Sequence, residues 1–351
     1  MQSIRAYLTL SDGTKYEGIS FGAHTNVAGE AAFTTGMTGY TESLTDPSYK
    51  GQILIFSYPL IGNYGVQPRH TWESGRIQTA GIVVSTYNET PSHWSSKSPL
   101  ASWLVKENTP AIQIKDTRAI IHRIRDRGAM LATLTFGKSR LEMHDPNSEN
   151  LAAQVSTKQM YIEGTGKHKI VLVDCGVKRN IQRCLLSRDV TLITVPYNYN
   201  PFSANMDFDG LLISNGPGDP KQVTETIRTV RIAIQRRVPT LGICLGNQIL
   251  ALAAGGDTYK LKFGHRGQNQ PCSLDGTKKC YLTTQNHGFA VGKIPKGFRT
   301  WFTNANDQTN EGIIHKRLPF MSVQFHPEAN PGPTDTDWIF DEFIENIKAS
   351  S

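Results

Sequence analysis

Cysteine is scarce in this sequence, and its spacing argues against two classes of protein. The 351 residues contain five cysteines, none of them precedes Cys175, and no two form a Cys-x-x-Cys pair. An odd number with this spacing fits neither a disulfide framework nor a structural zinc site. We therefore expect a cytoplasmic protein without a bound metal, in which a free thiol can take part in chemistry.

Long hydrophobic runs are also absent. The longest apolar stretch, residues 241–256, is interrupted by Asn247, Gln248 and several glycines, so it cannot span a bilayer. The first residues, MQSIRAYLTLSDG, lack the continuous apolar segment of a secretory signal. The hydrophobic fraction of 38% is that of a globular protein, and a length of 351 residues allows two domains.

Positive charge is in excess, but the excess is mild and scattered. The formal net charge is +7. The densest arginine clusters, in 123–127 and 228–237, have the spacing of solvated helix faces, and no zinc-finger or RNP-like pattern accompanies them. The sequence therefore argues against nucleic-acid binding and leaves open a docking face for a protein or an anionic ligand.

The hydrophobic pattern changes along the chain and predicts two domains. Residues 1–140 contain short β-branched segments separated by turns and then two helical patterns, which predicts a strand-rich α+β domain. Residues 141–168 are polar and predict a linker. In residues 169–351 short apolar runs alternate with helical segments, which predicts an open, mostly parallel sheet flanked by helices. The expected strands of this second domain cover 169–174, 190–195, 210–214 and 239–243.

The sharpest local motif is Gly242-Ile243-Cys244-Leu245-Gly246, where an apolar strand meets an apolar helix. Small residues on either side of a nucleophile permit the tight turn of a nucleophile elbow, and the positive end of the following helix favours a thiolate. Cys244 is therefore a candidate nucleophile. A cysteine packed as a small hydrophobe in a strand is the alternative.

Two further segments complete a candidate hydrolase site. His326 and Glu328 lie two residues apart, on the same side of an extended backbone, where the carboxylate can orient the imidazole as a general base. Taken alone, His-Pro-Glu also fits a surface turn. The Gly/Pro-rich loop 214–220 follows an expected strand and can present backbone N–H groups to an oxyanion, although its composition also fits a plain turn.

Other motifs accompany these three elements. They are Gly29-Glu30, Thr35 to Tyr40, Leu44 to Tyr49, Tyr58 to Gly65, Asp174 to Asn180, Gly267 to Pro271 and Gln285 to Val291. The three elements resemble the class I, triad-type glutamine amidotransferases. The further motifs resemble the carbamoyl phosphate synthetase small subunit. Their residues resemble most the glutaminase portion of the eukaryotic pyrimidine-pathway enzymes.

The resemblance implies roles for particular residues. Cys244 would be the nucleophile, His326 the base and later acid, and Glu328 its orienting partner. The backbone N–H groups of Gly216 and Leu245 would form the oxyanion hole. The implied glutamine-binding positions are Ser48, Gly216, Gly218, Leu245, Gln248, Asn286, Gly288 and Phe289.

One position departs from the family pattern. The family usually reads Cys-Leu-Gly-His-Gln, whereas Asn247 stands at the fourth place here. Because asparagine forms hydrogen bonds but does not titrate, we expect a local, tuning effect that leaves the triad intact.

The resemblance also implies an activity and a partner. The chain would be the glutaminase component of glutamine-dependent carbamoyl phosphate synthetase: it would hydrolyse L-glutamine through a thioester and supply ammonia for carbamoyl phosphate formation in pyrimidine, and also arginine, biosynthesis. No Gly-x-x-x-x-Gly-Lys-Ser/Thr loop occurs. We therefore expect no cofactor on this chain, with ATP and Mg²⁺ used by the large synthetase component, a separate subunit or a fused domain. Residues 1–140 are the expected docking surface.

Two other functions remain compatible with the sequence. One is a non-catalytic regulatory module of the same complex, and the other is a glutaminase of another synthase, as in the anthranilate or guanylate pathway. Ammonia-dependent relatives carry serine at the nucleophile position, so Cys244 argues for a working glutaminase. The motifs in residues 1–140 argue against another synthase.

Overall fold

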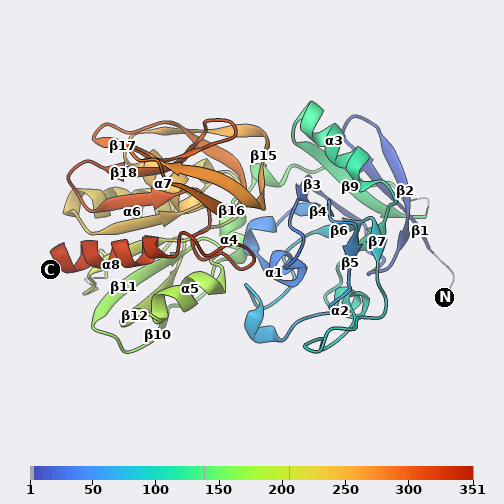
Figure 1. The fold of residues 1–351 in the computed structure, drawn as a ribbon, viewed down its shortest axis with the longest axis horizontal. Helices are drawn as coiled ribbons and strands as arrows, with labels where there is room; N and C mark the ends of the chain where they lie inside the picture. Colours follow the sequence, from blue (N-terminus) through green and yellow to red (C-terminus); the bar gives the residue numbers. More distant parts are fainter. Residues whose placement is uncertain (1–3, 138, 205, 351) are drawn as a thin grey trace. The chain divides into compact units, whose positions relative to one another are not determined.

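The computed structural model describes residues 4–137, 139–204 and 206–350, and its chain divides into two compact units, Met1–Ser148 and Glu149–Ser351 (Figure 1). The segment 141–168, predicted as a linker, contains helix α4 (Leu151–Val155) and strand β10 (Tyr161–Glu163). Strand β10 pairs with β12 (Val190–Pro196), so this part of the segment belongs to the second unit.

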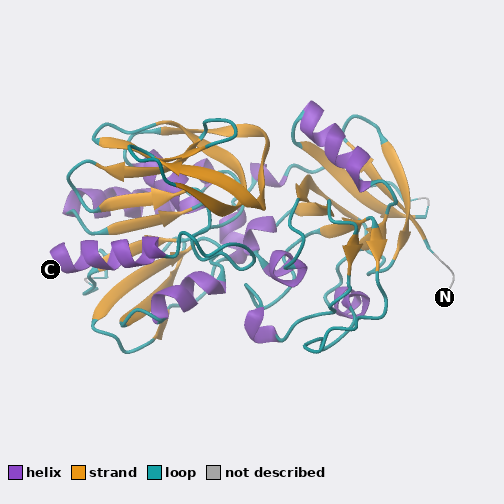
Figure 2. Ribbon diagram, in the orientation of Figure 1, coloured by secondary structure: helices purple, strands orange, loops and turns teal. Residues whose placement is uncertain are grey.

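Seven strands of the first unit close into a barrel in the order β1-β2-β8-β6-β4-β3-β9. Figure 2 distinguishes the strands of the chain from its helices and loops. The buried Ala6, Leu8 and Leu10 alternate with more exposed residues along β1, as expected for a strand with one face in the core. The barrel strands are β1 (Arg5–Leu10), β2 (Lys15–Ser20), β3 (Val27–Thr34), β4 (Gln52–Phe56), β6 (Gly81–Val84), β8 (Ala111–Gln113) and β9 (Met130–Phe136).

Three helices accompany the barrel in the first unit. Both predicted helical patterns form helices, α2 (Leu100–Lys106) and α3 (Thr117–Arg127). Helix α3 begins where the Asp116 carboxylate accepts a hydrogen bond from the Ala119 N–H, which is N-capping. The unit also contains α1 (Tyr40–Thr45), a 3-10 turn at Pro47–Tyr49, and the short strands β5 (Leu60–Ile61) and β7 (Thr86–Tyr87).

The second unit is built on a ten-stranded sheet in the order β10-β12-β11-β13-β14-β19-β18-β16-β15-β17. Its predicted strands form as β11 (His168–Asp174), β12, β13 (Gly210–Ile213) and β14 (Thr240–Ile243), and with β19 (Phe320–Val323) they make a parallel block. The remaining strands pair antiparallel. They include a long hairpin that the sequence pattern did not predict, β15 (Asp257–Leu274) with β16 (Cys280–Lys293), and also β17 (Phe298–Asn304) and β18 (Asn310–His315).

Helices cover both faces of the parallel block, which explains its continuous apolar strands. Ile170 and Leu172 of β11 pack with residues of α5 (Arg179–Leu186) and α8 (Trp338–Ser350). Val171 and Val173 pack on the other face with residues of α6 (Thr224–Arg236) and α7 (Leu245–Ala253). Within the described parts of the chain, every helix is too short or too polar to cross a membrane.

Candidate functional site

The predicted elbow forms at the carboxyl end of β14. Strand β14 ends at Ile243, helix α7 begins at Leu245, and Cys244 between them has φ 53° and ψ −101°. A positive φ is strained for a residue with a Cβ, and such strain is typical of nucleophile elbows. The Cys244 N–H donates to the carbonyl of Val323 at 2.8 Å, which ties the elbow to the end of the neighbouring parallel strand β19. The Cys244 side chain is buried.

Glycine at two positions permits the close packing around the elbow. A Cβ on Gly246 would lie 2.2 Å from the backbone oxygen of Ile213, so only glycine lets the start of α7 approach β13 this closely. A Cβ on Gly216, in the loop after β13, would lie 2.1 Å from the carbonyl oxygen of Cys175 and 2.9 Å from the Leu245 side chain. The two predicted oxyanion-hole residues, Gly216 and Leu245, are therefore neighbours.

A Gly246→Ala substitution is expected to destabilise the protein by about 2 kcal/mol or more, because the added methyl group overlaps backbone atoms that cannot move independently of β13. Urea unfolding measures the effect. Gly75→Ala is the matched control, since its Cβ would meet no described atom closer than Arg69 Nη2 at 3.7 Å. Equal urea midpoints for the two variants would contradict the expectation.

His326 and Glu328 lie in the segment after β19 and contact each other, although the backbone forms a turn at Pro327 and Glu328 where an extended chain was expected. His326 Nδ1 donates to Glu328 Oε1 at 2.7 Å, and both side chains are buried. His326 Nε2 has no hydrogen-bond partner among the described residues. Burial alone would lower the pKa of His326, but the charges of Glu328 and then Cys244 raise it to about 10. A raised pKa favours the imidazolium form of the ring, whose Nδ1–H is held by Glu328.

A buried lysine completes the charge balance around Glu328. Lys178, the residue before α5, places Nζ 3.0 Å from Glu328 Oε1 and donates to the Ala329 carbonyl at 2.6 Å. Burial would raise the pKa of Glu328, but Lys178 and then His326 lower it to about 2. Lys178 belongs to a motif that the sequence indicated, yet nothing in the sequence predicted this ion pair.

Most of the predicted glutamine-binding residues gather beside Cys244. Its Sγ contacts the Asn286 carbonyl oxygen at 3.7 Å, and Gln248 Nε2 donates to the Phe289 carbonyl at 2.8 Å. Strand β16 thus passes the nucleophile with Asn286, Gly288 and Phe289. Gly218 has no described contact with this group. Ser48 lies in the 3-10 turn of the first unit, and a Cβ on Gly218 would meet Leu151.

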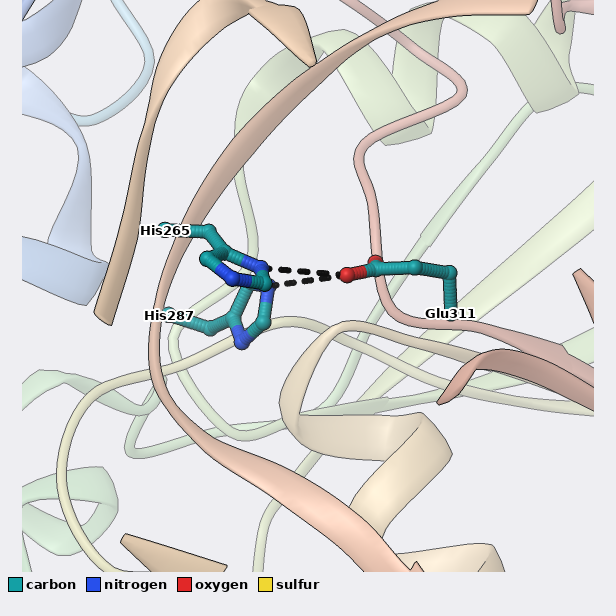
Figure 3. Close-up of side chains that lie close together, drawn as sticks. All are labelled: His265, His287 and Glu311. Carbon is teal, nitrogen blue, oxygen red and sulfur yellow. Dashed lines mark hydrogen bonds and ion pairs between the residues drawn. The ribbon is translucent and has the colours of Figure 1, made fainter. Parts of the chain in front are cut away.

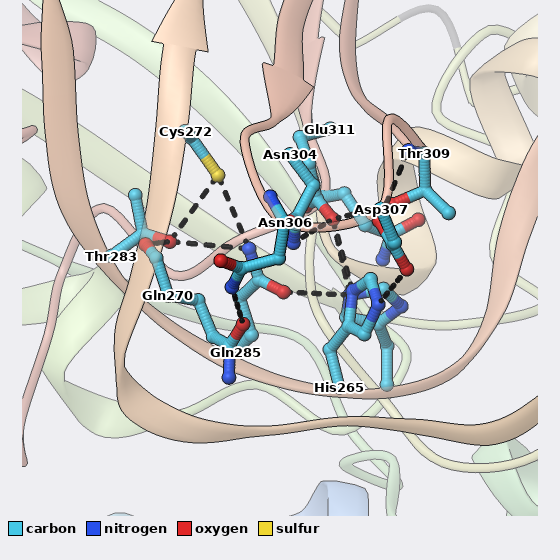
Figure 4. A network of polar contacts seen from close by, with 12 residues as sticks. His265, Gln270, Cys272, Thr283, Gln285, Asn304, Asn306, Asp307, Thr309 and Glu311 are labelled. Carbon is cyan, nitrogen blue, oxygen red and sulfur yellow. Dashed lines mark hydrogen bonds and ion pairs between the residues drawn. The ribbon is translucent and has the colours of Figure 1, made fainter.

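A second buried polar cluster joins β15, β16 and the β17–β18 region. His265, His287 and Glu311 bring one potential ligand atom each within 4.8 Å of one another (Figure 3). However, His265 donates from Nδ1 to Glu311 at 3.1 Å and from Nε2 to Asp307 at 2.8 Å (Figure 4). Burial lowers the pKa of His265, but these two carboxylates raise it above its ordinary value.

Both ring nitrogens of His265 contact carboxylates, so the structure shows this cluster as a hydrogen-bond network. His287 Nδ1 also donates to the Phe289 carbonyl at 2.8 Å. The network therefore braces the part of β16 that carries Asn286, Gly288 and Phe289.

Sequence reasoning missed one residue that touches the nucleophile. Gln324 Nε2 lies 3.7 Å from Cys244 Sγ, and the Gln324 side chain is completely buried. The available signal was alternation along an extended segment, since Gln324 precedes His326 by two residues and so shares its side of the backbone.

Comparison with known proteins covers both units. Residues 171–346 match the family "Glutamine amidotransferase class-I", and residues 8–134 match "Carbamoyl-phosphate synthase small chain, CPSase domain".

The relatives include fused and separate proteins. The multifunctional protein CAD of Squalus acanthias is 47% identical over 356 residues, which cover 97% of this chain and 16% of that protein. The multifunctional protein URA2 of Saccharomyces cerevisiae is 44% identical and covers 97% of this chain and 17% of that protein. The carbamoyl phosphate synthase arginine-specific small chain of Chaetomium globosum is 44% identical over 363 residues, which cover 98% of this chain and 79% of that protein.

This chain therefore spans a small part of the multifunctional relatives and most of the arginine-specific small chain. Because both of its units match, the chain belongs to the carbamoyl-phosphate synthase small chain family, with a second unit of the class-I glutamine amidotransferase type.

Proposed function

We propose that this chain hydrolyses L-glutamine and supplies the ammonia to a carbamoyl phosphate synthetase component. The observation that carries the proposal is the buried group of Cys244, His326, Glu328 and Lys178, in which Glu328 binds His326 Nδ1 and the charge of Cys244 helps to raise the pKa of His326. A thiolate paired with an imidazolium is the resting state of a cysteine hydrolase. The four groups then carry two positive and two negative charges, which makes their common burial tolerable.

The proposed reaction proceeds in two halves. In the first, the Cys244 thiolate attacks the glutamine carboxamide carbon, and the Gly216 and Leu245 N–H groups bind the oxyanion. The C–N bond then breaks as His326 gives its Nε2 proton to the leaving nitrogen, which releases ammonia and leaves a thioester. In the second half, His326 takes a proton from water, the hydroxide attacks the thioester, and cleavage of the C–S bond releases glutamate and restores the ion pair.

The substrate contacts belong to the same proposal. Gln248, Asn286, Gly288 and Phe289 would hold glutamine beside Cys244, together with Gly218 and with Ser48 from the first unit. Thiol chemistry of this kind needs a reducing compartment, and we place the chain in the cytoplasm. The ATP- and Mg²⁺-dependent steps would take place on the synthetase component, a separate subunit or a fused domain, docked on the first unit.

Glutamate release from glutamine, measured with and without the synthetase component, tests the proposal. We expect release that increases with the synthetase and falls at least about a thousandfold in Cys244→Ser, because the alcohol is a far weaker nucleophile at neutral pH. Ammonia should still support carbamoyl phosphate synthesis by the complex of this variant. A folded wild-type protein that releases no glutamate under either condition would favour the non-catalytic regulatory module instead.

A further inference from the structure

A row of buried amides approaches Cys244 from the side of β19. Gln324 Nε2 lies 3.7 Å from Sγ, and Gln324 Oε1 accepts hydrogen bonds from Asn247 Nδ2 and Gln248 Nε2, both at 3.1 Å. All three amide side chains are buried. Burial in a low-dielectric interior strengthens such a row and makes an unsatisfied member costly.

The direction of the Gln324 amide follows from Gln248, whose own direction is fixed by a group that has only one hydrogen-bonding role. Gln248 Nε2 also faces the Phe289 carbonyl at 2.8 Å, and a carbonyl can only accept, so the Gln248 amide must present its nitrogen. In the structure the Ser322 hydroxyl donates to Asn247 Oδ1 at 2.8 Å, and Asn247 Nδ2 donates to Gln324 Oε1. Two donors thus meet at Gln324 Oε1, and the opposite orientation of Gln324 would set N–H groups against each other.

The consequence is that an N–H group, and not a carbonyl, faces the sulfur from this side. The sulfur has a second neighbour of opposite character, because the Asn286 carbonyl oxygen also lies 3.7 Å from Sγ. The protonated thiol can donate to that carbonyl, whereas a thiolate is repelled by it. Gln324 offsets this repulsion. The other charged groups of the site are His326, whose pKa the Cys244 charge helps to raise, and the ion pair of Glu328 with Lys178.

We infer that Gln324 is a further catalytic residue, which donates a hydrogen bond to the Cys244 thiolate and holds Sγ for attack, and that Asn247 is a positioning residue that orients the Gln324 amide. This inference rests on the proposed glutaminase function. It also explains what Asn247 does in the site. Its uncharged amide donates to Gln324 and accepts from Ser322 at every pH, because neither amide group titrates.

Alkylation of Cys244 by iodoacetamide across pH 5.5 to 9.5 tests the inference without glutamine or a partner. We expect Gln324→Met to lower the alkylation rate at pH 6.5 about tenfold and to move the profile to higher pH, because a hydrogen bond to a charged group is lost. Gln324→Glu should lower it at least as much. Its carboxylate can still accept from Asn247 and Gln248, but it sets negative charge against the sulfur.

Asn247→Ala should give a smaller loss, and the double variant with Gln324→Met should lose no more than Gln324→Met alone, because Asn247 acts through Gln324. The far-UV circular dichroism spectrum shows whether a Gln324 variant is folded. If it is not, the alkylation profile of Asn247→Ala tests the inference in its place. Gln182→Met is the matched control, since this buried glutamine bonds to Tyr161 and Thr194 and is expected to leave the profile unchanged.

A Gln324→Met profile that superimposes on the wild-type profile would overturn the catalytic role, and full additivity in the double variant would overturn the positioning role. These outcomes are distinct from failure of the proposed function, which is read from glutamate release. If the wild type releases no glutamate but the Gln324 variants show the expected shift relative to the wild-type alkylation profile, the glutaminase proposal is refuted and the Gln324 hydrogen bond is established.

Discussion

A His326→Asn variant is expected to hydrolyse glutamine about a thousandfold more slowly than the wild type, which is the usual loss when a general acid–base group is removed. The ring has two functions that asparagine cannot combine. Its Nδ1 is bonded to Glu328 at 2.7 Å, and its Nε2 proton is left for the leaving nitrogen. Rapid-quench measurement of the glutamyl thioester locates the loss in the acylation half-reaction.

The control for this variant is His315→Asn. His315 lies at the end of β18, and its Nδ1 accepts hydrogen bonds from the N–H groups of Arg317 and Leu318, a role that an asparagine oxygen can partly fill. We expect its rate to equal that of the wild type. A His326→Asn rate within about tenfold of the wild type would contradict the assignment of His326 as the proton donor.

The residues predicted to be catalytic were accessible from the sequence because local geometry decides their arrangement. The elbow at Cys244 needs only a strand, small neighbours and a helix in succession. His326 and Glu328 meet across a short turn, in which the Ala329 N–H donates to the His326 carbonyl, so their closeness is also local. The parallel strands were accessible for a related reason, since burial on both faces leaves continuous apolar runs.

Contacts between distant segments could not be predicted in this way. Lys178 and Glu328 pair although their motifs lie far apart in the chain, and a lysine before a helix looks the same in sequence whether it is buried or solvated. The long β15–β16 hairpin contains polar residues at many positions, because its buried side is lined by hydrogen-bond networks such as that around His265. Closure of the first-unit barrel likewise depends on pairing between β1 and β9, which no local pattern specifies.

A Lys178→Met variant is expected to lose about 3 kcal/mol of stability at pH 7, because it leaves the Glu328 charge buried without its ammonium partner. Methionine fills a similar volume, so the loss reports mainly on charge. Chemical denaturation at pH 7 and at pH 3.5 measures it.

The pH dependence of this loss has a definite sign. The pKa of Glu328 is lowered from its ordinary value of 4.5 to about 2 in the folded protein, so the ion pair contributes its full stability above pH 4.5 and loses it as pH falls toward 2. The wild type therefore loses this contribution in acid, whereas the variant has less of it to lose. The difference in unfolding free energy between them should shrink at pH 3.5, and an equal difference at both pH values would refute the ion-pair explanation.

Adding Glu328→Gln to Lys178→Met separates the two roles of the carboxylate. The double variant has no unpaired carboxylate, so it should regain part of the lost stability, since the penalty arises from the buried charge and not from the missing lysine. It should nevertheless remain a poor glutaminase, because an amide at position 328 no longer stabilises the His326 imidazolium at Nδ1. Recovered stability without recovered activity would assign Lys178 to the folding of the site and Glu328 to its chemistry. Recovery of both would mean that the imidazolium does not depend on Glu328.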